Sequence, residues 1–344
     1  MTMRKSLILA LSLILALNLA GCSGKVGEQT QYQATFLDLF DTVTTIVGKD
    51  ADEGAFQKKA QSIHDALLEY HQLFDVYNQY EGIHNLKTVN DQAGIAPVTV
   101  DRRIIDLLND CKALWEATDG RVDVTMGSVL ALWHDARDAG LDDPAHAALP
   151  SEDDLTAAAQ HTGFDCLVID EAASTVFLTD PQARLDVGAV AKGWSAQRVC
   201  EDAPTGLLIS VGGNVCATGP KDPSGTPWVV GVTDPDDSSH YLHTLYVDGG
   251  SVVTSGDYQR YYVVNGVPYH HIIDPDTLYP AAYWRSVTIV CPDSGVADAL
   301  STALFVLPLE QGQALLEQFD AHAMWVDAQG EQYYSPGFRD LIRT

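Results

Sequence analysis

Basic residues are few in this chain. Its 344 residues include 20 Lys and Arg against 47 Asp and Glu, which gives a formal net charge of −27. A surface of this sign repels the phosphates of nucleic acids and the head groups of anionic lipids. The sequence therefore argues against a nucleic-acid partner. Any anionic ligand must instead be met by a local device, such as a metal ion, a helix N-terminus or a placed lysine.

Cysteine is also scarce, and its spacing fits neither a zinc site nor a disulfide framework. One of the six lies near the N-terminus. The other five are an odd number, widely spaced and without a C-x-x-C pair, and we expect them to be small buried apolar side chains. They are Cys111, Cys166, Cys200, Cys216 and Cys291.

A long apolar run occurs only at the N-terminus. Arg4 and Lys5 precede an apolar stretch over residues 7–19, which suits a signal peptide and is short for a membrane-spanning helix. The sequence LAGC that ends in Cys22 resembles the lipobox of bacterial lipoproteins. That resemblance implies cleavage before Cys22 and its acylation, hence a lipid anchor on the extracytoplasmic face of the cell membrane. The alternative is an ordinary signal peptide with a chance cysteine.

The rest of the chain reads as one α+β domain. We expect a signal peptide over 1–21, a polar lipidated tether over 22–33 and the folded domain over 34–344. Strands do not alternate strictly with helices, which favours α+β over a doubly wound sheet. Helices are predicted over 56–74, over 104–115 with Asp101 as cap, over 189–199 and over 296–305, with a loop over 136–150. Strands are predicted over 36–47, 166–169, 175–178, 207–211, 228–232, 242–247, 261–264 and 286–290.

The first stretch with chemical potential is RLDVGAVAKGW, residues 184–194. A predicted strand ends in Asp186, Gly188 permits a tight turn, and a helix follows. The N–H groups of such a helix N-terminus attract an anion, and Lys192 adds a full positive charge. The stretch is not a Walker A loop, because the lysine precedes the glycine and no Ser or Thr follows. Taken alone, it could equally be a structural turn.

Two further stretches carry titratable groups. The adjacent His270 and His271 point to opposite faces of a predicted strand, so one of them should face a cleft or solvent, where histidine can move a proton. The alternative is a histidine satisfied by the neighbouring Asp274. Asp298 and Thr302 share one face of a predicted helix and could give two oxygens to Mg²⁺. The alternative is a helix cap with a back-bonded threonine.

In this order, these stretches resemble the ApbE family, the FAD:protein FMN transferases, over nearly the whole mature chain. The segments that carry the resemblance are LFDTVTT (39–45), FDVYN (74–78), TDGRVDVTMG (118–127), LDVGAVAKG (185–193), SVGGN (210–214), TSGDY (254–258), HHIIDP (270–275) and ADALST (297–302). The resemblance implies a single ApbE-like domain of mixed sheets and packed helices.

The resemblance also implies a ligand set. Mg²⁺ would be held by the Ala189 carbonyl, Asp298 and Thr302, and Ser301 stands where some members have a further aspartate. FAD would contact Phe40, Tyr77, Arg121, Val122, Asp123, Asp186, Lys192 and Ile273. Two departures stand out. Arg121 replaces a small residue, so its side chain could reach FAD or cap the pocket. Leu278 replaces a turn glycine, so that turn either avoids positive φ or is strained.

The implied reaction moves FMN from FAD to a Thr or Ser hydroxyl of an acceptor protein and releases AMP. We expect His271 to accept the hydroxyl proton, held in its tautomer by Asp274 or by a backbone group, with His270 as the second candidate. The acceptor would be a flavoprotein subunit of a membrane or extracytoplasmic redox system. FAD hydrolysis to FMN and AMP, and flavin binding without turnover, are the alternatives.

Overall fold

The computed structural model describes residues 30–344; the predicted signal peptide, Cys22 and residues 22–29 of the predicted tether lie outside this range. Its largest sheet has eight strands in the order β1-β2-β6-β7-β10-β13-β14-β15, each paired antiparallel with its neighbour. The strands are β1 (Thr30–Leu39), β2 (Thr42–Asp50), β6 (Leu207–Val211), β7 (Asn214–Ala217), β10 (Gly250–Gly256), β13 (Ser286–Cys291), β14 (His322–Val326) and β15 (Gln332–Tyr334).

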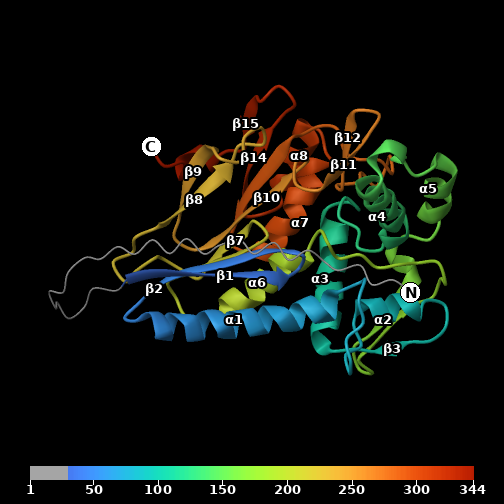
Figure 1. Ribbon diagram of the computed structural model, residues 1–344, viewed down its shortest axis with the longest axis horizontal. Helices are drawn as coiled ribbons and strands as arrows, with labels where there is room; N and C mark the ends of the chain where they lie inside the picture. The colour runs from blue at the N-terminus through green and yellow to red at the C-terminus, as the bar shows by residue number, and fades with distance from the viewer. Residues whose placement is uncertain (1–29) are drawn as a thin grey trace.

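Both faces of this sheet are covered (Figure 1). Helices α1 (Glu53–Phe74), α6 (Ala191–Asp202) and α7 (Ser294–Phe305) pack on one face, and the hairpin β8 (Trp228–Thr233)–β9 (Tyr241–Val247) packs on the other. Successive side chains of a strand point to opposite faces. In β6, Ile209 therefore joins the core under the helices, whereas Leu208 packs against the cluster that includes the hairpin.

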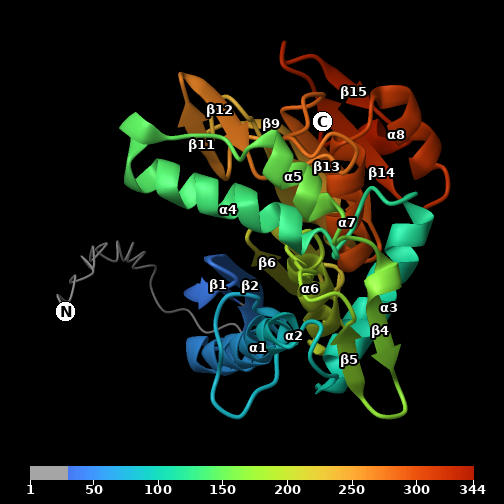
Figure 2. The ribbon, with the colours of Figure 1, turned by 90° about the vertical axis from the view of Figure 1, so that its right-hand side faces the viewer.

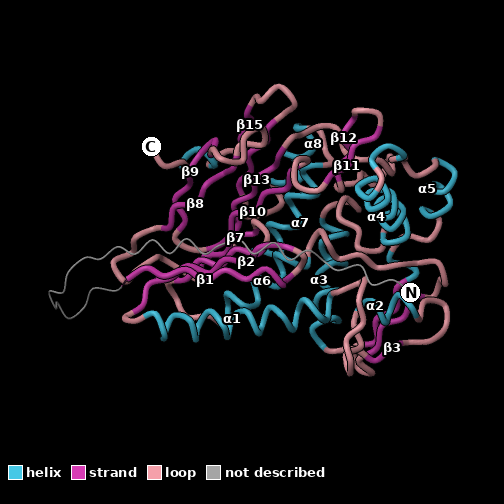
Figure 3. The backbone as a smooth tube through the Cα atoms, in the orientation of Figure 1, coloured by secondary structure: helices cyan, strands magenta, loops and turns pink. Residues whose placement is uncertain are grey.

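Most of the remaining elements lie at one end of this layered core, as Figures 2 and 3 show, whereas the 3₁₀ turn at Phe338–Leu341 packs against β14 and β9 and the helix over Leu309–Leu316 packs against α7. Buried residues of α3, α6, α7 and β13 belong to one continuous cluster, which makes the chain a single α+β domain, as predicted. These elements are α2 (Leu86–Asp91), β3 (Val98–Thr99), α3 (Arg102–Ala117), α4 (Gly127–Asp142), α5 (Glu152–Ala159), β4 (Leu167–Asp170), β5 (Thr175–Leu178), β11 (Tyr261–Val264), β12 (Val267–His270), α8 (Leu309–Leu316) and the short 3₁₀ turns at Pro144–His146, Phe164–Cys166 and Phe338–Leu341.

Local patterns predicted several elements well. The expected helices correspond to α1, α3, α6 and α7, and Asp101 caps α3 by accepting a hydrogen bond from the Arg103 N–H. The seven strands predicted beyond residue 165 are present within two residues of their expected ends. Cysteines 111, 200, 216 and 291 are buried, and all five beyond Cys22 are free thiols. Among residues 30–344, no helix is both long and apolar enough to cross a membrane.

Four expectations were wrong. The single strand over 36–47 is the hairpin β1–β2, and residues 30–33 belong to β1 rather than to the tether, because Thr30 pairs with Asp50. Helix α4 runs to Asp142 through much of the predicted loop. The sheets are antiparallel rather than mixed; in the described part of the chain, a parallel bridge joins only Met126 and Arg184.

The β1–β2 turn shows why one strand was expected. Phe40 and Asp41 both have positive φ, 52° and 51°. A two-residue hairpin turn of this kind is usually marked by Asn-Gly or a similar pair. Here the pair is Phe40-Asp41, with no glycine, so the alternation of apolar residues continues across the turn and predicts a single strand.

Leu278 has a positive φ of 63°. The sequence left open whether this turn avoids positive φ or is strained, and the turn is therefore strained. The Leu278 N–H donates to the Asp274 carbonyl at 2.8 Å, and its own carbonyl accepts from Trp133 Nε1 at 2.9 Å. A non-glycine residue in this region costs about 1–2 kcal/mol. The two backbone hydrogen bonds hold the turn in place despite this strain.

Leu278→Gly should therefore be more stable than Leu278→Ala by about 1 kcal/mol. Both variants lose the leucine packing, but only glycine relieves the backbone. Urea unfolding of the two variants measures the difference, and an alanine variant that is as stable as the glycine variant would contradict the strain.

Candidate active site

Helices α6 and α7 meet at a distance that only glycine allows. A Cβ atom on Gly193, in the first turn of α6, would lie 2.3 Å from the Ser294 carbonyl oxygen and 2.4 Å from Asp298 Cβ. Separations under 3 Å force the backbones apart. Gly193 thus fixes the N-terminus of α6 directly against the aspartate of α7.

Asp298 is buried in this contact, with 4% of its surface exposed. Its Oδ2 accepts a hydrogen bond from the Gly193 N–H at 2.8 Å, and Lys192 Nζ lies 3.9 Å from the same oxygen. Burial raises the pKa of Asp298, against the opposing effects of Lys192 and the Gly193 N–H. The N-cap of helix α7 is Asp293. Asp298 is therefore not a helix cap, which was the alternative interpretation of this residue.

Two oxygens, one in the turn before α6 and one on α7, have no hydrogen-bond partner within residues 30–344: the Ala189 carbonyl and the Thr302 hydroxyl. The Gly193 N–H, which could otherwise donate to the Ala189 carbonyl, donates to Asp298 instead. Ser301 is engaged elsewhere: its hydroxyl donates to the Asp298 carbonyl at 2.8 Å and contacts Ser255 Oγ at 2.7 Å. Carboxylate, hydroxyl and carbonyl oxygens are the hard ligands that Mg²⁺ prefers.

A metal at this place would use a single carboxylate. No group of three or more His, Cys, Asp or Glu suited to a metal occurs in the described chain. A site with few protein oxygens suits a cation that keeps water or substrate oxygens as its other ligands.

The turn before α6 is held from both sides. Asp186 Oδ1 accepts from the Gly188 N–H at 2.8 Å, and Lys192 Nζ donates to the Gly188 carbonyl at 3.0 Å. Asn90 anchors the preceding residue, since its amide donates to the Leu185 carbonyl and its Oδ1 accepts from the Leu185 N–H, at 3.0 and 2.7 Å. Sequence reasoning missed Asn90, which no motif marks.

The TDGRVDVTMG segment lies alongside this turn. The Asp186 N–H donates to the Val124 carbonyl at 2.8 Å, which brings buried Val122 and half-buried Asp123 beside the turn. Burial raises the pKa of Asp123, whose Oδ1 accepts from both the N–H and the hydroxyl of Thr125.

Arg121 caps the neighbouring turn. Its guanidinium forms an ion pair with Asp276 and lies 4.0 Å from Asp274 Oδ1. The side chain is thus committed to the turn that follows the two histidines, which favours the capping role over direct contact with FAD. Ile273, in the same stretch, is buried and forms a β-bridge with Pro280.

His271 is oriented by the backbone of Arg260. The Arg260 carbonyl accepts from the His271 N–H at 3.1 Å and contacts His271 Nδ1 at 3.2 Å. A carbonyl can only accept, so Nδ1 carries the proton and Nε2 is left as the free acceptor. Burial, and then the charges of Lys192 and Arg260, lower the pKa of His271 to about 3, so the ring is neutral at neutral pH.

The structure corrects the expected role of Asp274 as the partner of His271. Asp274 Oδ1 accepts from the Asp276 N–H at 2.9 Å, within its own turn, and the orienting contact to His271 comes from the backbone alternative. His270, the second candidate base, hydrogen-bonds the Ala281 carbonyl at 2.8 Å and packs edge-on against Phe305. His270 is therefore held by structural contacts, which favours His271 as the base.

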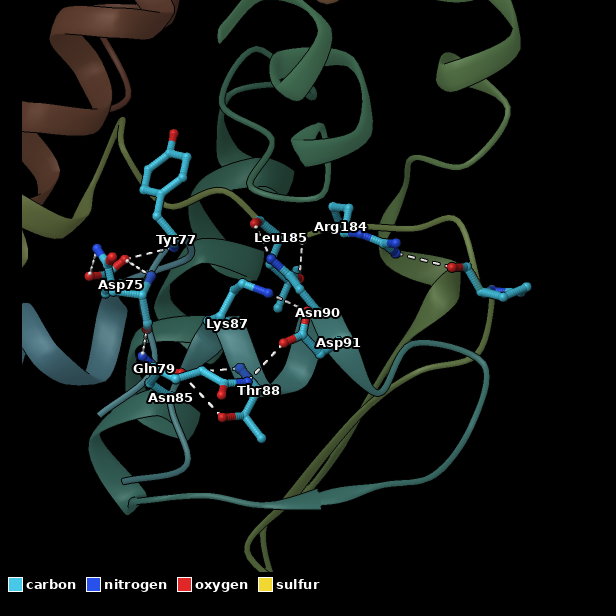
Figure 4. A network of polar contacts seen from close by, with 12 residues as sticks. Asp75, Tyr77, Gln79, Asn85, Lys87, Thr88, Asn90, Asp91, Arg184 and Leu185 are labelled. Atoms are coloured by element: carbon cyan, nitrogen blue, oxygen red, sulfur yellow. Dashed lines mark hydrogen bonds and ion pairs between the residues drawn. The ribbon is translucent and has the colours of Figure 1, made fainter. Parts of the chain in front are cut away.

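Phe40 and Tyr77 are linked by a polar relay that the sequence did not reveal. The Phe40 N–H donates to His71 Nδ1 at 3.1 Å, and His71 Nε2 lies 3.2 Å from the Tyr80 hydroxyl. That hydroxyl donates to Asp75 Oδ2 at 2.7 Å, and Asp75 Oδ1 accepts from the Tyr77 N–H at 2.7 Å. Figure 4 shows the Tyr77 ring projecting away from this turn.

Together these residues describe an α+β protein whose candidate site contains a buried aspartate, a lysine at a helix N-terminus and a neutral histidine. The model of the ApbE family matches residues 30–325, and the chain belongs to the ApbE family.

Individual proteins with similar sequences or structures also belong to this family. An FAD:protein FMN transferase of Treponema pallidum is 34% identical over 314 residues, covering 84% of each chain. One of Klebsiella pneumoniae is 32% identical over 268 residues, covering 74% of this chain and 80% of that protein. The crystal structure of the ApbE protein of Thermotoga maritima superposes with a TM-score of 0.81 at 30% identity, covering 92% of this chain and all of that one.

Asp298→Asn should stabilise the metal-free fold, by about 1 kcal/mol or more. The variant removes a buried charge, yet its amide oxygen can still accept from the Gly193 N–H. Thermal unfolding in EDTA measures the change in Tm. A matched control is Asp110→Asn, a partly exposed carboxylate that pairs with Arg198. A lower Tm for Asp298→Asn than for the wild type would contradict the unfavourable burial.

Proposed function

We propose that this site transfers FMN from FAD to a Thr or Ser hydroxyl of an acceptor protein and releases AMP. The transferase activity is that of the named relatives and of the family to which the chain belongs. The observation that supports a hydroxyl as the nucleophile is the geometry of His271. Its Nδ1 contacts the Arg260 carbonyl, and its Nε2 has no hydrogen-bond partner among residues 30–344.

In the proposed reaction, the acceptor oxygen attacks the FMN-side phosphorus of FAD. The bond from that phosphorus to the AMP-side bridging oxygen breaks, and AMP leaves with the electron pair. His271 Nε2 takes the proton of the attacking hydroxyl. Lys192, fixed by the Gly188 carbonyl at the N-terminus of α6, offers its charge to a phosphate oxygen.

Four of the FAD contacts proposed for this chain lie in or beside the turn before α6. Asp186 and Lys192 share the turn before α6, and Asp186 is linked through its N–H to the segment that contains Val122 and Asp123. The remaining proposed contacts are Phe40, Tyr77, Arg121 and Ile273; Arg121 would contribute through its backbone, since its side chain pairs with Asp276.

Mg²⁺ would suit the oxygens of Ala189, Asp298 and Thr302, for which the Gly193 N–H is the one hydrogen-bond donor found among residues 30–344. When bound, it would neutralise pyrophosphate charge and improve AMP as a leaving group. This role also answers the constraint of net charge −27. Mg²⁺ together with FAD should raise the Tm of the wild type but not that of Asp298→Asn.

His271→Ala should slow transfer by about 10²–10⁴-fold while FAD affinity stays within a few-fold. Because the pKa of His271 is lowered, the neutral acceptor form persists well below pH 6.5 and is lost only near the lowered pKa. For the free wild-type enzyme, kcat/KM should therefore stay level between pH 8 and about 5. An unchanged transfer rate in His271→Ala would refute the role as base.

One assay separates this function from its alternatives. The protein is incubated with FAD, Mg²⁺ and a candidate acceptor, and the products are resolved by denaturing gel and chromatography. Flavin fluorescence that stays on the acceptor after denaturation supports the transferase. Free FMN with AMP and no labelled acceptor indicates an FAD pyrophosphatase, and intact FAD indicates a binding protein.

The proposed anchor is a lipid on Cys22, which would hold the enzyme at the extracytoplasmic face of the membrane, where its acceptor would be a redox flavoprotein subunit. The LAGC sequence ending at Cys22 supports this. Wild-type protein from cells grown with a labelled fatty acid should carry the label, and Cys22→Ser should carry none, as measured on a denaturing gel. A Cys22→Ser variant that still takes up the label would contradict the anchor.

A further inference from the structure

Tyr77 is fixed at both of its ends although its ring is open. Its exposed fraction is 57%. At the backbone, its N–H donates to Asp75 Oδ1 at 2.7 Å. At the far end, its hydroxyl lies 2.6 Å from Nδ1 of His134, a residue of α4 that is 57 positions away in sequence. An exposed tyrosine usually samples several rotamers, so this double attachment calls for a reason.

His134 is suited to accept from the phenol. Burial lowers the pKa of His134, which keeps the ring neutral and leaves one nitrogen unprotonated. A tyrosine hydroxyl is protonated at neutral pH. The hydroxyl therefore donates and Nδ1 accepts. The rings lie 5.8 Å apart at 49°, so the contact is made by this hydrogen bond rather than by stacking.

The pair belongs to the site rather than to a remote surface. His134 Nδ1 lies 4.0 Å from Asp186 Oδ2, in the turn that precedes Lys192. The charges of Arg137 and Arg260 both act on Tyr77 and His134, and Arg260 is the residue whose carbonyl orients His271. The hydrogen bond thus ties Tyr77 to α4, and His134 brings α4 close to the turn before α6.

We propose that His134 is a positioning residue that holds the Tyr77 ring in the orientation in which it meets the flavin of FAD. This rests on the proposed function, since it takes Tyr77 as a flavin contact. A flat aromatic face fixed before binding loses little rotamer entropy when a flat ring system packs on it. His134 need not touch the flavin; it acts through Tyr77.

The test is a double-mutant cycle on FAD affinity, read from the quenching of flavin fluorescence at equilibrium. Tyr77→Phe and His134→Leu should each weaken binding by about 3- to 10-fold, the loss of one hydrogen bond. The double variant should be no weaker than the poorer single variant, because both substitutions remove the same contact. In turnover, KM should rise while kcat stays within about twofold.

Two further variants separate positioning from mere packing. His134→Asn puts a carboxamide oxygen close to the place of Nδ1 and should recover most of the affinity lost in His134→Leu. His146→Gln is the matched control, an exposed histidine paired with Asp143 just after α4, and should leave affinity unchanged. Tm values of all variants are compared in parallel to exclude unfolding.

The proposal is overturned if the fold-changes of Tyr77→Phe and His134→Leu multiply in the double variant. It is overturned equally if Asn and Leu at position 134 have the same affinity, or if neither single variant weakens binding. The wild type serves as a separate check: failure of the wild type to bind FAD would refute the proposed function itself, whatever the variants do.

Discussion

The buried carboxylate of Asp298 is the constraint around which the site is organised. It lies under the first turn of α6, where Gly193 offers an N–H group and no side chain. A buried charge with one hydrogen bond and a lysine at 3.9 Å is only partly compensated. The same approach of α6 to α7 places Lys192 near this carboxylate, at the end of the turn that begins with Asp186. Under the proposed function, this partly compensated charge stands where a cation and an anionic substrate would bind.

The chemistry that lies within one element could be read from the sequence. Asp298 and Thr302 share a helix face by spacing alone, and the turn before α6 was visible as a glycine followed by a lysine. The strand expected to end in Asp186 is absent, since only Arg184 forms a single bridge there. The first two predictions depend on a single helix or turn, for which sequence periodicity is sufficient. The same holds for α1, for α3 with its Asp101 cap, and for the separate short strands.

Partners supplied by other parts of the chain could not be read in this way. The carbonyl that orients His271 comes from Arg260, and every residue has a carbonyl, so no residue type marks it. Asn90 reaches Leu185 across 95 positions, and His134 reaches Tyr77 across 57. The turns at Phe40-Asp41 and Leu278 were missed or left open for another reason: tertiary packing and hydrogen bonds there override the local preference for glycine or asparagine.

The early start of β1 also limits how far the first strand could lie from a lipid anchor on Cys22. Thr30 already pairs with Asp50 at the edge of the large sheet. With Cys22 as the anchor, the eight peptide links to Thr30 span at most about 28 Å when fully extended. That is less than the thickness of one lipid bilayer with its head groups, about 40 Å. The tether would therefore keep Thr30 within about 28 Å of the lipid surface, and the orientation of the domain would set how far above that surface the acceptor hydroxyl is presented.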